Sequence, residues 1–105
     1  MSTEQYESFI RDRITELRLK MNVSEHRMSL ELGKSGAYIR NITSGIALPS
    51  LKELFRIMEY LEVEPPEFFE PLQDNDSLQG QIIQQLHQLN DEQLAKVNTF
   101  IQWMK

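Results

Sequence analysis

Cysteine is absent from this 105-residue chain, which excludes disulfide bonds, thiol catalysis and the common cysteine-based zinc sites. No apolar run approaches the roughly 18 residues that a membrane-spanning helix needs. The first residues, MSTEQYESFI, lack the basic and apolar regions of a signal peptide. These absences predict a soluble, unexported protein, with the reducing cytoplasm as its compartment.

Positive charge is scarce overall, since the net charge is −5 at pH 7, but the shortage is uneven. Residues 1–58 contain nine Lys/Arg and seven Asp/Glu, a net charge of +2, whereas residues 59–105 contain two and nine, a net charge of −7. The first half is compatible with contacts to phosphate groups, and the acidic second half with staying away from them.

Residue patterns for catalysis or metal binding are also lacking. His26 and His87 are far apart in the sequence, so we interpret both as solvent-exposed side chains rather than metal ligands. The chain has no phosphate-binding loop and no nucleophile motif, and periodicity brings no pair of carboxylates into a recognisable pocket. We therefore expect no enzyme, no metal site and no cofactor.

Apolar residues do recur at helical spacing, and no alternation typical of strands is present, so the predicted fold class is all-α. The first predicted helix covers residues 6–21. Its apolar face consists of Tyr6, Ile10, Ile14, Leu17 and Met21. The second begins at its N-cap, Ser24, with Val23 able to pack on Met28, and ends at Gly33, because glycine tolerates the left-handed conformation there.

The third predicted helix follows at once, with Ser35 as its N-cap, Ile39 and Ile42 facing inward, and a stop near Gly45. The fourth begins at the S-x-x-E capping box of Ser50 and Glu53. Its apolar face consists of Leu51, Leu54, Phe55, Met58 and Leu61. A short fifth helix is expected to start at Pro65 and Pro66, to hold Phe68 and Phe69, and to stop at Pro71.

Polar, turn-forming residues then separate a C-terminal part. We predict a domain over residues 1–71, a linker over 72–77 and a helical hairpin over 78–105, with Asn90 and Gln93 capping the second hairpin helix. The first hairpin helix has one apolar stripe of Leu78, Ile82, Leu86 and Leu89.

The last helix has two adjoining apolar strips, and one face of the helix cannot hold all of their residues. One strip is expected to pack within the chain and the other on a second copy; the alternative is that both fold back on the N-terminal helices. The predicted dimerisation residues are Leu94, Val97, Phe100, Ile101, Trp103 and Met104.

Two short helices joined by a glycine-containing turn form the helix-turn-helix arrangement. From about Ile10 to Phe69 the chain resembles the phage-repressor-like, Xre-type helix-turn-helix family of bacterial transcription regulators. The resemblance is carried by RITELR (13–18), VS (23–24), LG (32–33), YIRNI (38–42), SG (44–45), LPSL (48–51) and VEPPEFF (63–69). It implies a five-helix, lambda-repressor-like domain that binds double-stranded DNA as a homodimer and most often represses transcription.

The resemblance also implies roles for individual residues. It places Gly36, Ala37, Arg40 and Asn41 against base edges, where Arg can pair with guanine and Asn with adenine. Gly36 and Ala37 bring no hydrogen-bonding side chain. The expected phosphate-contacting residues are Glu25, Arg27, Lys34, Ser35, Tyr38, Thr43 and Ser44.

Glu25 departs from the family pattern, which commonly has a glutamine there. A carboxylate would repel a phosphate unless Arg27, Lys34 or Arg40 pairs with it, although acidic residues also simply favour the first turn of a helix. The alternative function is therefore a helix-turn-helix fold used as a protein-protein interaction module with weak or no DNA binding.

Overall fold

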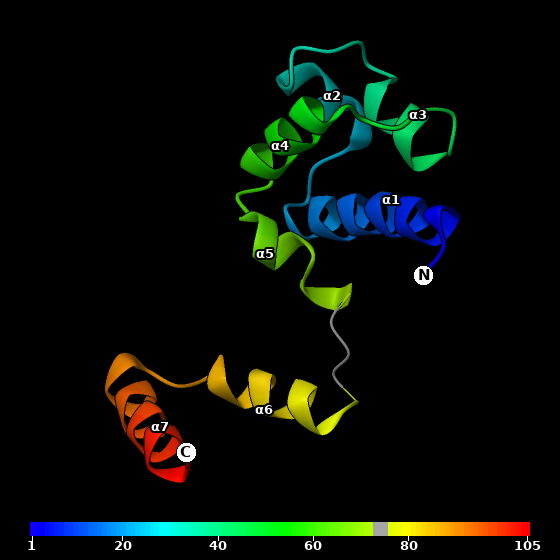
Figure 1. Ribbon diagram of the computed structural model, residues 1–105. Coiled ribbons are helices and arrows are strands. Elements are labelled where there is room, and N and C mark those ends of the chain that lie inside the picture. The colour runs from blue at the N-terminus through cyan, green and yellow to red at the C-terminus, as the bar shows by residue number, and fades with distance from the viewer. Residues whose placement is uncertain (73–75) are drawn as a thin grey trace. The chain divides into compact units, whose positions relative to one another are not determined.

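The computed structural model describes residues 1–72 and 76–105, and all regular structure in these ranges is helical, which confirms the predicted all-α class (Figure 1). Contacts divide the chain into two units, Met1–Phe69 and Glu70–Lys105. The first contains α1 (Thr3–Lys20), α2 (Glu25–Glu31), α3 (Tyr38–Thr43), α4 (Leu51–Tyr60) and α5 (Pro65–Phe68). The second contains a 3-10 helix (Glu70–Leu72), α6 (Leu78–Leu86) and α7 (Asp91–Met104).

Side-chain caps fix where most of these helices begin. The predicted caps at Ser24, Ser50 and Asn90 are confirmed, the last two as full capping boxes with Glu53 and Gln93. A further box, Ser2 with Gln5, starts α1 at the same S-x-x-Q spacing. Within the described ranges, no helix is both long enough and apolar enough to cross a membrane.

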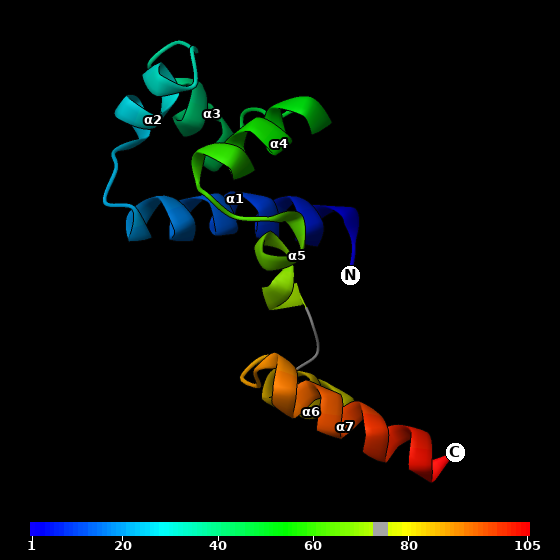
Figure 2. The same cartoon turned by 90° about the vertical axis from the view of Figure 1, so that its left-hand side faces the viewer.

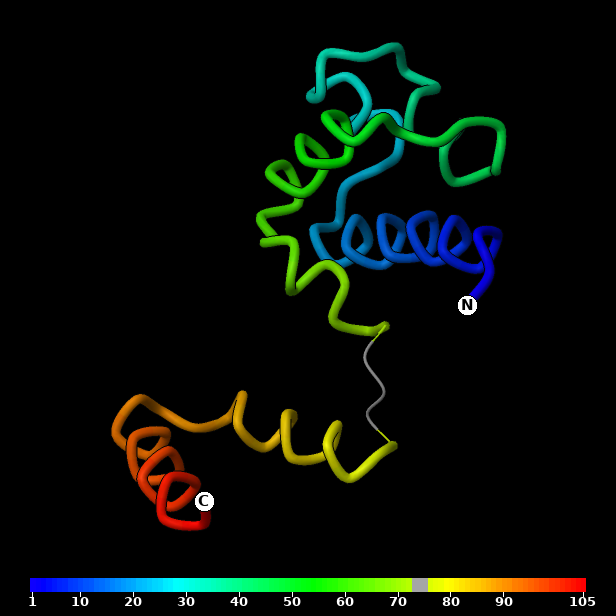
Figure 3. The backbone as a smooth tube through the Cα atoms, viewed as in Figure 1, coloured from blue at the N-terminus to red at the C-terminus, as the bar shows by residue number. Residues whose placement is uncertain are grey.

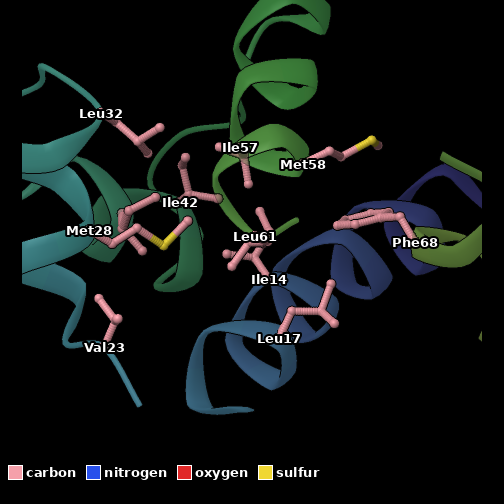
Figure 4. Close-up of a cluster of buried hydrophobic side chains, with 11 residues drawn as sticks. Ile14, Leu17, Val23, Met28, Leu32, Ile42, Ile57, Met58, Leu61 and Phe68 are labelled. Carbon is pink, nitrogen blue, oxygen red and sulfur yellow. The ribbon is translucent and has the colours of Figure 1, made fainter. Parts of the chain in front are cut away.

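The core of the first unit is built by side chains from α1 to α5 that point toward one centre (Figure 4). α2 and α3 lie side by side on the same side of α1 in both ribbon views (Figure 1, Figure 2). The buried hydrophobic residues are Ile14, Leu17, Val23, Met28, Leu32, Ile39, Ile42, Ile57, Met58, Leu61 and Phe68. Both helices of the helix-turn-helix, α2 and α3, pack on this cluster.

The predicted apolar face of α1 is wrong at its ends. Tyr6 and Met21 are exposed, whereas Phe9 packs against the core. The Phe9 ring meets Phe68 edge-on with 6.1 Å between ring centroids, and stacks on Phe69 at 6.0 Å. Phe68 and Phe69 therefore pack against Phe9 of α1 and not against Tyr6.

The predicted face of α4 is wrong in a similar way. Leu51 and Phe55 are exposed, 68% and 46% of their surfaces respectively, whereas Ile57 is fully buried. Leu54, Ile57, Met58 and Leu61 together turn toward the core. Leu54, Met58 and Leu61 are therefore predicted correctly, whereas Leu51 and Phe55 are wrong and Ile57 was missed, because tertiary packing decides which edge of a broad apolar stripe is covered.

α5 is held to α1 by a buried charge. The Arg13 guanidinium, 8% exposed, donates from Nε to the carbonyl oxygen of Phe68 and from Nη2 to that of Glu67, each at 2.8 Å, and it pairs with Glu16. Both carbonyls lie in the last turn of α5, which ends at Phe68, where intrahelical donors run out. Pro71 does not stop α5 as expected, since it lies within the following 3-10 helix.

In the second unit, α6 and α7 follow one another along the chain as two separate helices (Figure 3). Ser77 caps α6 through a hydrogen bond from the Gly80 amide. The predicted linker falls partly on residues 73–75, which lie outside the described residues, so the linker stays a prediction. Leu72 belongs to the 3-10 helix.

Candidate nucleic-acid interface

The turn between α2 and α3 follows the prediction at its start. Leu32 is the C-cap of α2, and Gly33 has the expected positive φ of 77°. The Lys34 amide returns to the carbonyl oxygen of Ser29 at 3.0 Å and satisfies one of the last carbonyls of the helix. The chain is thus reversed within a few residues, as a helix-turn-helix requires.

The predicted cap of α3 is wrong. Ser35 does not cap the helix with its side chain: the Tyr38 amide bonds to the Ser35 carbonyl in a turn, and this turn delays the start of α3 until Tyr38, with Ala37 as N-cap. The hydroxyl that satisfies an amide in the first turn of α3 comes from α2. Ser29 Oγ accepts from the Ile39 amide at 3.0 Å.

Ser29 is fully buried and links the two helices at their contact. Besides accepting from Ile39, its hydroxyl donates to the carbonyl oxygen of Glu25 at 2.7 Å, so both hydrogen-bonding functions are used. The residue was not singled out from the sequence. The available signal was a polar residue on the inward side of the second predicted helix, between Met28 and Leu32.

The C-terminal end of α3 is held by α1 and by its own loop. Arg11 Nε donates to the carbonyl oxygen of Ile42 at 3.1 Å. The amides of Ile46 and Ala47 both donate to the carbonyl oxygen of Asn41, at 2.9 and 3.0 Å, after Gly45 turns with φ of 90°. A six-residue helix is marginal alone, so these contacts at both ends fix its orientation.

α4 holds the turn through one basic and one acidic side chain, Arg56 and Glu53. Arg56 Nη2 donates to the carbonyl oxygen of Leu32 at 3.1 Å, and Lys34 Nζ lies 2.8 Å from Glu53 Oε2. The hydrogen bond from Lys34, together with that from the Ser50 amide, lowers the pKa of Glu53 to about 2. Glu53 thus joins the cap of α4 to the turn, although the sequence indicated only its capping role.

Two of the predicted phosphate-contacting residues face this network. The Lys34 ammonium lies 5.2 Å from the centre of the Tyr38 ring as well as next to Glu53. The Tyr38 hydroxyl is buried, and burial together with the nearby Glu53 carboxylate raises the pKa of Tyr38 to about 12. Burial counts against a phosphate contact through this hydroxyl, and a phosphate would compete with Glu53 for Lys34.

Glu25 pairs with none of the three cations considered from the sequence. Its carboxylate accepts a hydrogen bond from the Thr43 hydroxyl at the end of α3. Arg27 instead lies 3.5 Å from Glu31, and Lys34 pairs with Glu53. Arg40 is exposed and has no ion-pair partner within the described part of the chain. Glu25 therefore adds a further polar link between α2 and α3.

Most of the predicted base-reading residues are brought together in one open hollow, lined by Glu25, His26, Gly36, Ala37 and Arg40. Asn41 is not in this lining and is half-buried. Ser35 and Ser44, two other predicted phosphate contacts, are exposed, and Thr43 is half-buried against Glu25. The hollow thus presents one free cation, Arg40, beside one carboxylate.

A pair of short helices joined by a glycine turn, with one helix fixed at both ends and open on its outer side, defines a helix-turn-helix domain. A helix-turn-helix family model matches residues 14–68, just over half of the chain. The protein therefore belongs to the phage-repressor-like, Xre-type helix-turn-helix family of DNA-binding transcription regulators. No curated protein and no solved structure matches the chain.

The Ser29 link yields a testable prediction. Ser29→Ala leaves the buried Ile39 amide without an acceptor, so we expect the free energy of unfolding to fall by about 1–3 kcal/mol. Urea unfolding followed by circular dichroism would measure the loss. Ser35→Ala is the matched control, because the exposed Ser35 side chain caps nothing. Equal losses in the two variants would contradict the assigned role of Ser29.

Proposed function

We propose that this protein is a cytoplasmic, sequence-specific transcription regulator, acting as a repressor, that inserts α3 of each of two subunits into the major groove. The observation that carries the proposal is the open hollow at the start of α3, where Arg40, which has no ion-pair partner among the described residues, lies with the small residues Gly36 and Ala37. Gly36 and Ala37 permit close approach of the backbone, and an arginine guanidinium can pair with both acceptors of guanine.

Dimerisation is proposed through the second unit. Large apolar side chains of α7 are exposed, among them Trp103 at 79% and Met104 at 60%, while Phe100 lies with its ring centroid 5.9 Å from that of Trp103. Leu78 and Ile82 of α6 are exposed too, so the predicted stripe on α6 is covered only in its later part. Exposed apolar surface of this extent favours a protein partner, and a second copy has the same surface to offer.

Selection from a random duplex library with the purified protein tests the function. We expect an enriched site with two related half-sites about 34 Å apart, one helical turn, because a two-fold dimer presents its two α3 helices to successive major-groove faces. Failure to enrich any sequence at low salt would reject the proposal.

A protein-protein interaction module is the second candidate, favoured by how few cations are free at the interface. Lys34 is paired with Glu53, Arg27 lies beside Glu31, and Glu25 adds a carboxylate to the hollow. Phosphate contacts supply much of the affinity of any DNA-binding protein. A protein that enriches no DNA but retains a specific protein partner through the α2–α3 face would support this candidate.

Glu25→Gln tests whether the carboxylate of Glu25 faces bound DNA. The substitution removes a negative charge facing the phosphates and keeps a carbonyl oxygen for the Thr43 hydroxyl, so DNA affinity should rise about five-fold, roughly 1 kcal/mol, with sequence preference unchanged. Titrations at low and moderate salt measure the change. Glu59→Gln, an exposed residue of α4, controls for net charge. An unchanged affinity at both salt concentrations would mean that Glu25 lies away from the DNA.

A further inference from the structure

The backbone of Gly36 is covered by a side chain from the other helix. A Cβ atom built on Gly36 would lie 2.5 Å from Cε1 and 2.6 Å from Nδ1 of His26, closer than real Cβ contacts come. The imidazole of His26 therefore occupies the space that a side chain at position 36 would enter. Gly36 is the first residue of the predicted base-reading set, so this space faces the proposed DNA site.

His26 is free to contact a ligand there. It is exposed on α2 and lines the hollow together with Ala37 and Arg40. Its ring makes no hydrogen bond or ion pair with any residue in the described ranges. A polar ring with no partner among the described residues, positioned over a glycine that lines the same hollow, has the properties of a side chain available to an external group.

We infer that His26 reads a base, and that α2 thereby supplies the hydrogen-bonding side chain that Gly36 lacks. The inference rests on the proposed function. A neutral imidazole carries one N–H donor, and purines present the N7 acceptor in the major groove. His26 donates to N7 of one purine, and Arg40, which lines the same hollow, contacts a neighbouring base pair.

Replacement of His26 tests the inference directly. His26→Ala should reduce the preference for a purine at one position of the selected site by about ten-fold, and leave the preferences at the other positions in place. The measurement is a competition titration of the full-length protein on the selected duplex and on duplexes changed at single base pairs. His87→Ala is the matched control, because it removes the other histidine, which lies near Glu70 in the second unit.

Gly36→Ala provides an independent variant. The Gly36 backbone is outside the left-handed region, and the atoms nearest to its new methyl group belong to the His26 ring, the end of an exposed side chain, so the ring moves and the domain stays folded. This variant should lose preference at the same base pair as His26→Ala. The double variant should lose little more base preference than either single variant, since both substitutions remove the same contact.

The outcomes separate this inference from the proposed function. If the wild-type protein enriches no sequence, the proposed function itself is rejected. If the wild-type protein selects a site, and His26→Ala binds the selected and changed duplexes with unaltered ratios, then His26 reads no base and the inference is overturned. Equal weakening on all duplexes would also overturn it, because that pattern belongs to a phosphate contact. Loss at one purine, shared with Gly36→Ala, supports it.

Discussion

Replacing Arg13 with methionine should lower the free energy of unfolding of the helix-turn-helix unit by about 3 kcal/mol. The guanidinium is 8% exposed and donates to the last two carbonyl oxygens of α5, those of Glu67 and Phe68. Methionine fills a similar volume but donates no hydrogen bond, so both carbonyls lose the bond from the guanidinium. Glu16 is half-exposed, and its carboxylate remains hydrated after the change, so the loss comes mainly from the carbonyls.

Thermal and urea unfolding, followed by circular dichroism, measure this effect. For a unit of this size, 3 kcal/mol corresponds to a fall in Tm of about 15 °C. Arg27→Met is the matched control: the same substitution on an exposed side chain, 3.5 Å from Glu31, should cost less than about 1 kcal/mol. Similar losses at both positions would show that the hydrogen bonds of Arg13 to α5 contribute little.

The parts of this fold that could be predicted from the sequence depend on short spacings. Ser50 and Glu53, like Asn90 and Gln93, lie three residues apart, and a capping box needs only that spacing to form. Gly33 has a positive φ because a chain that must reverse directly after a helix needs a residue without Cβ strain. These features are decided locally, so the sequence contains the whole signal.

The predictions that were wrong or missing concern features that depend on contacts between segments far apart in the sequence. Ser35 has good capping chemistry, yet the amide of Ile39 is taken by Ser29, ten residues earlier, because packing places the two helices in contact. The bond from Arg13 to Phe68 spans 55 residues. No pattern along the chain predicts such pairs, since arginine and serine are also common on exposed helix faces, where they make no such bond.

Some residues of the candidate site could likewise be predicted from the sequence, and others could not. Position within the helix-turn-helix predicts that Gly36, Ala37 and Arg40 share one surface, and the structure places all three around one hollow. His26 was interpreted only as solvent-exposed, because contact with Gly36 depends on the angle between α2 and α3. That angle is set by the buried hydroxyl of Ser29 and by Glu25, which accepts from Thr43.

Trp103→Glu should convert the protein from a dimer into a monomer and reduce its affinity for the two-half-site duplex by about 100-fold or more. Trp103 is 79% exposed in the single chain, so the substitution removes little packing within it beyond the ring contact with Phe100. In the proposed dimer the indole becomes buried with Phe100 and Met104, and a carboxylate there would be desolvated without a partner. The loss on DNA follows because a monomer binds one half-site and forfeits the second, linked contact.

Light scattering on the two proteins tests the assembly, with a mass near 12.4 kDa expected for Trp103→Glu and about twice that value for the wild type. Gln102→Glu introduces the same charge one residue away, on the polar side of α7, and should remain dimeric. Affinity for a single half-site should be equal in all three proteins, because the α2–α3 face is untouched. A monomeric wild type, or a Trp103→Glu protein that stays dimeric, would exclude the exposed strip of α7 as the dimer interface.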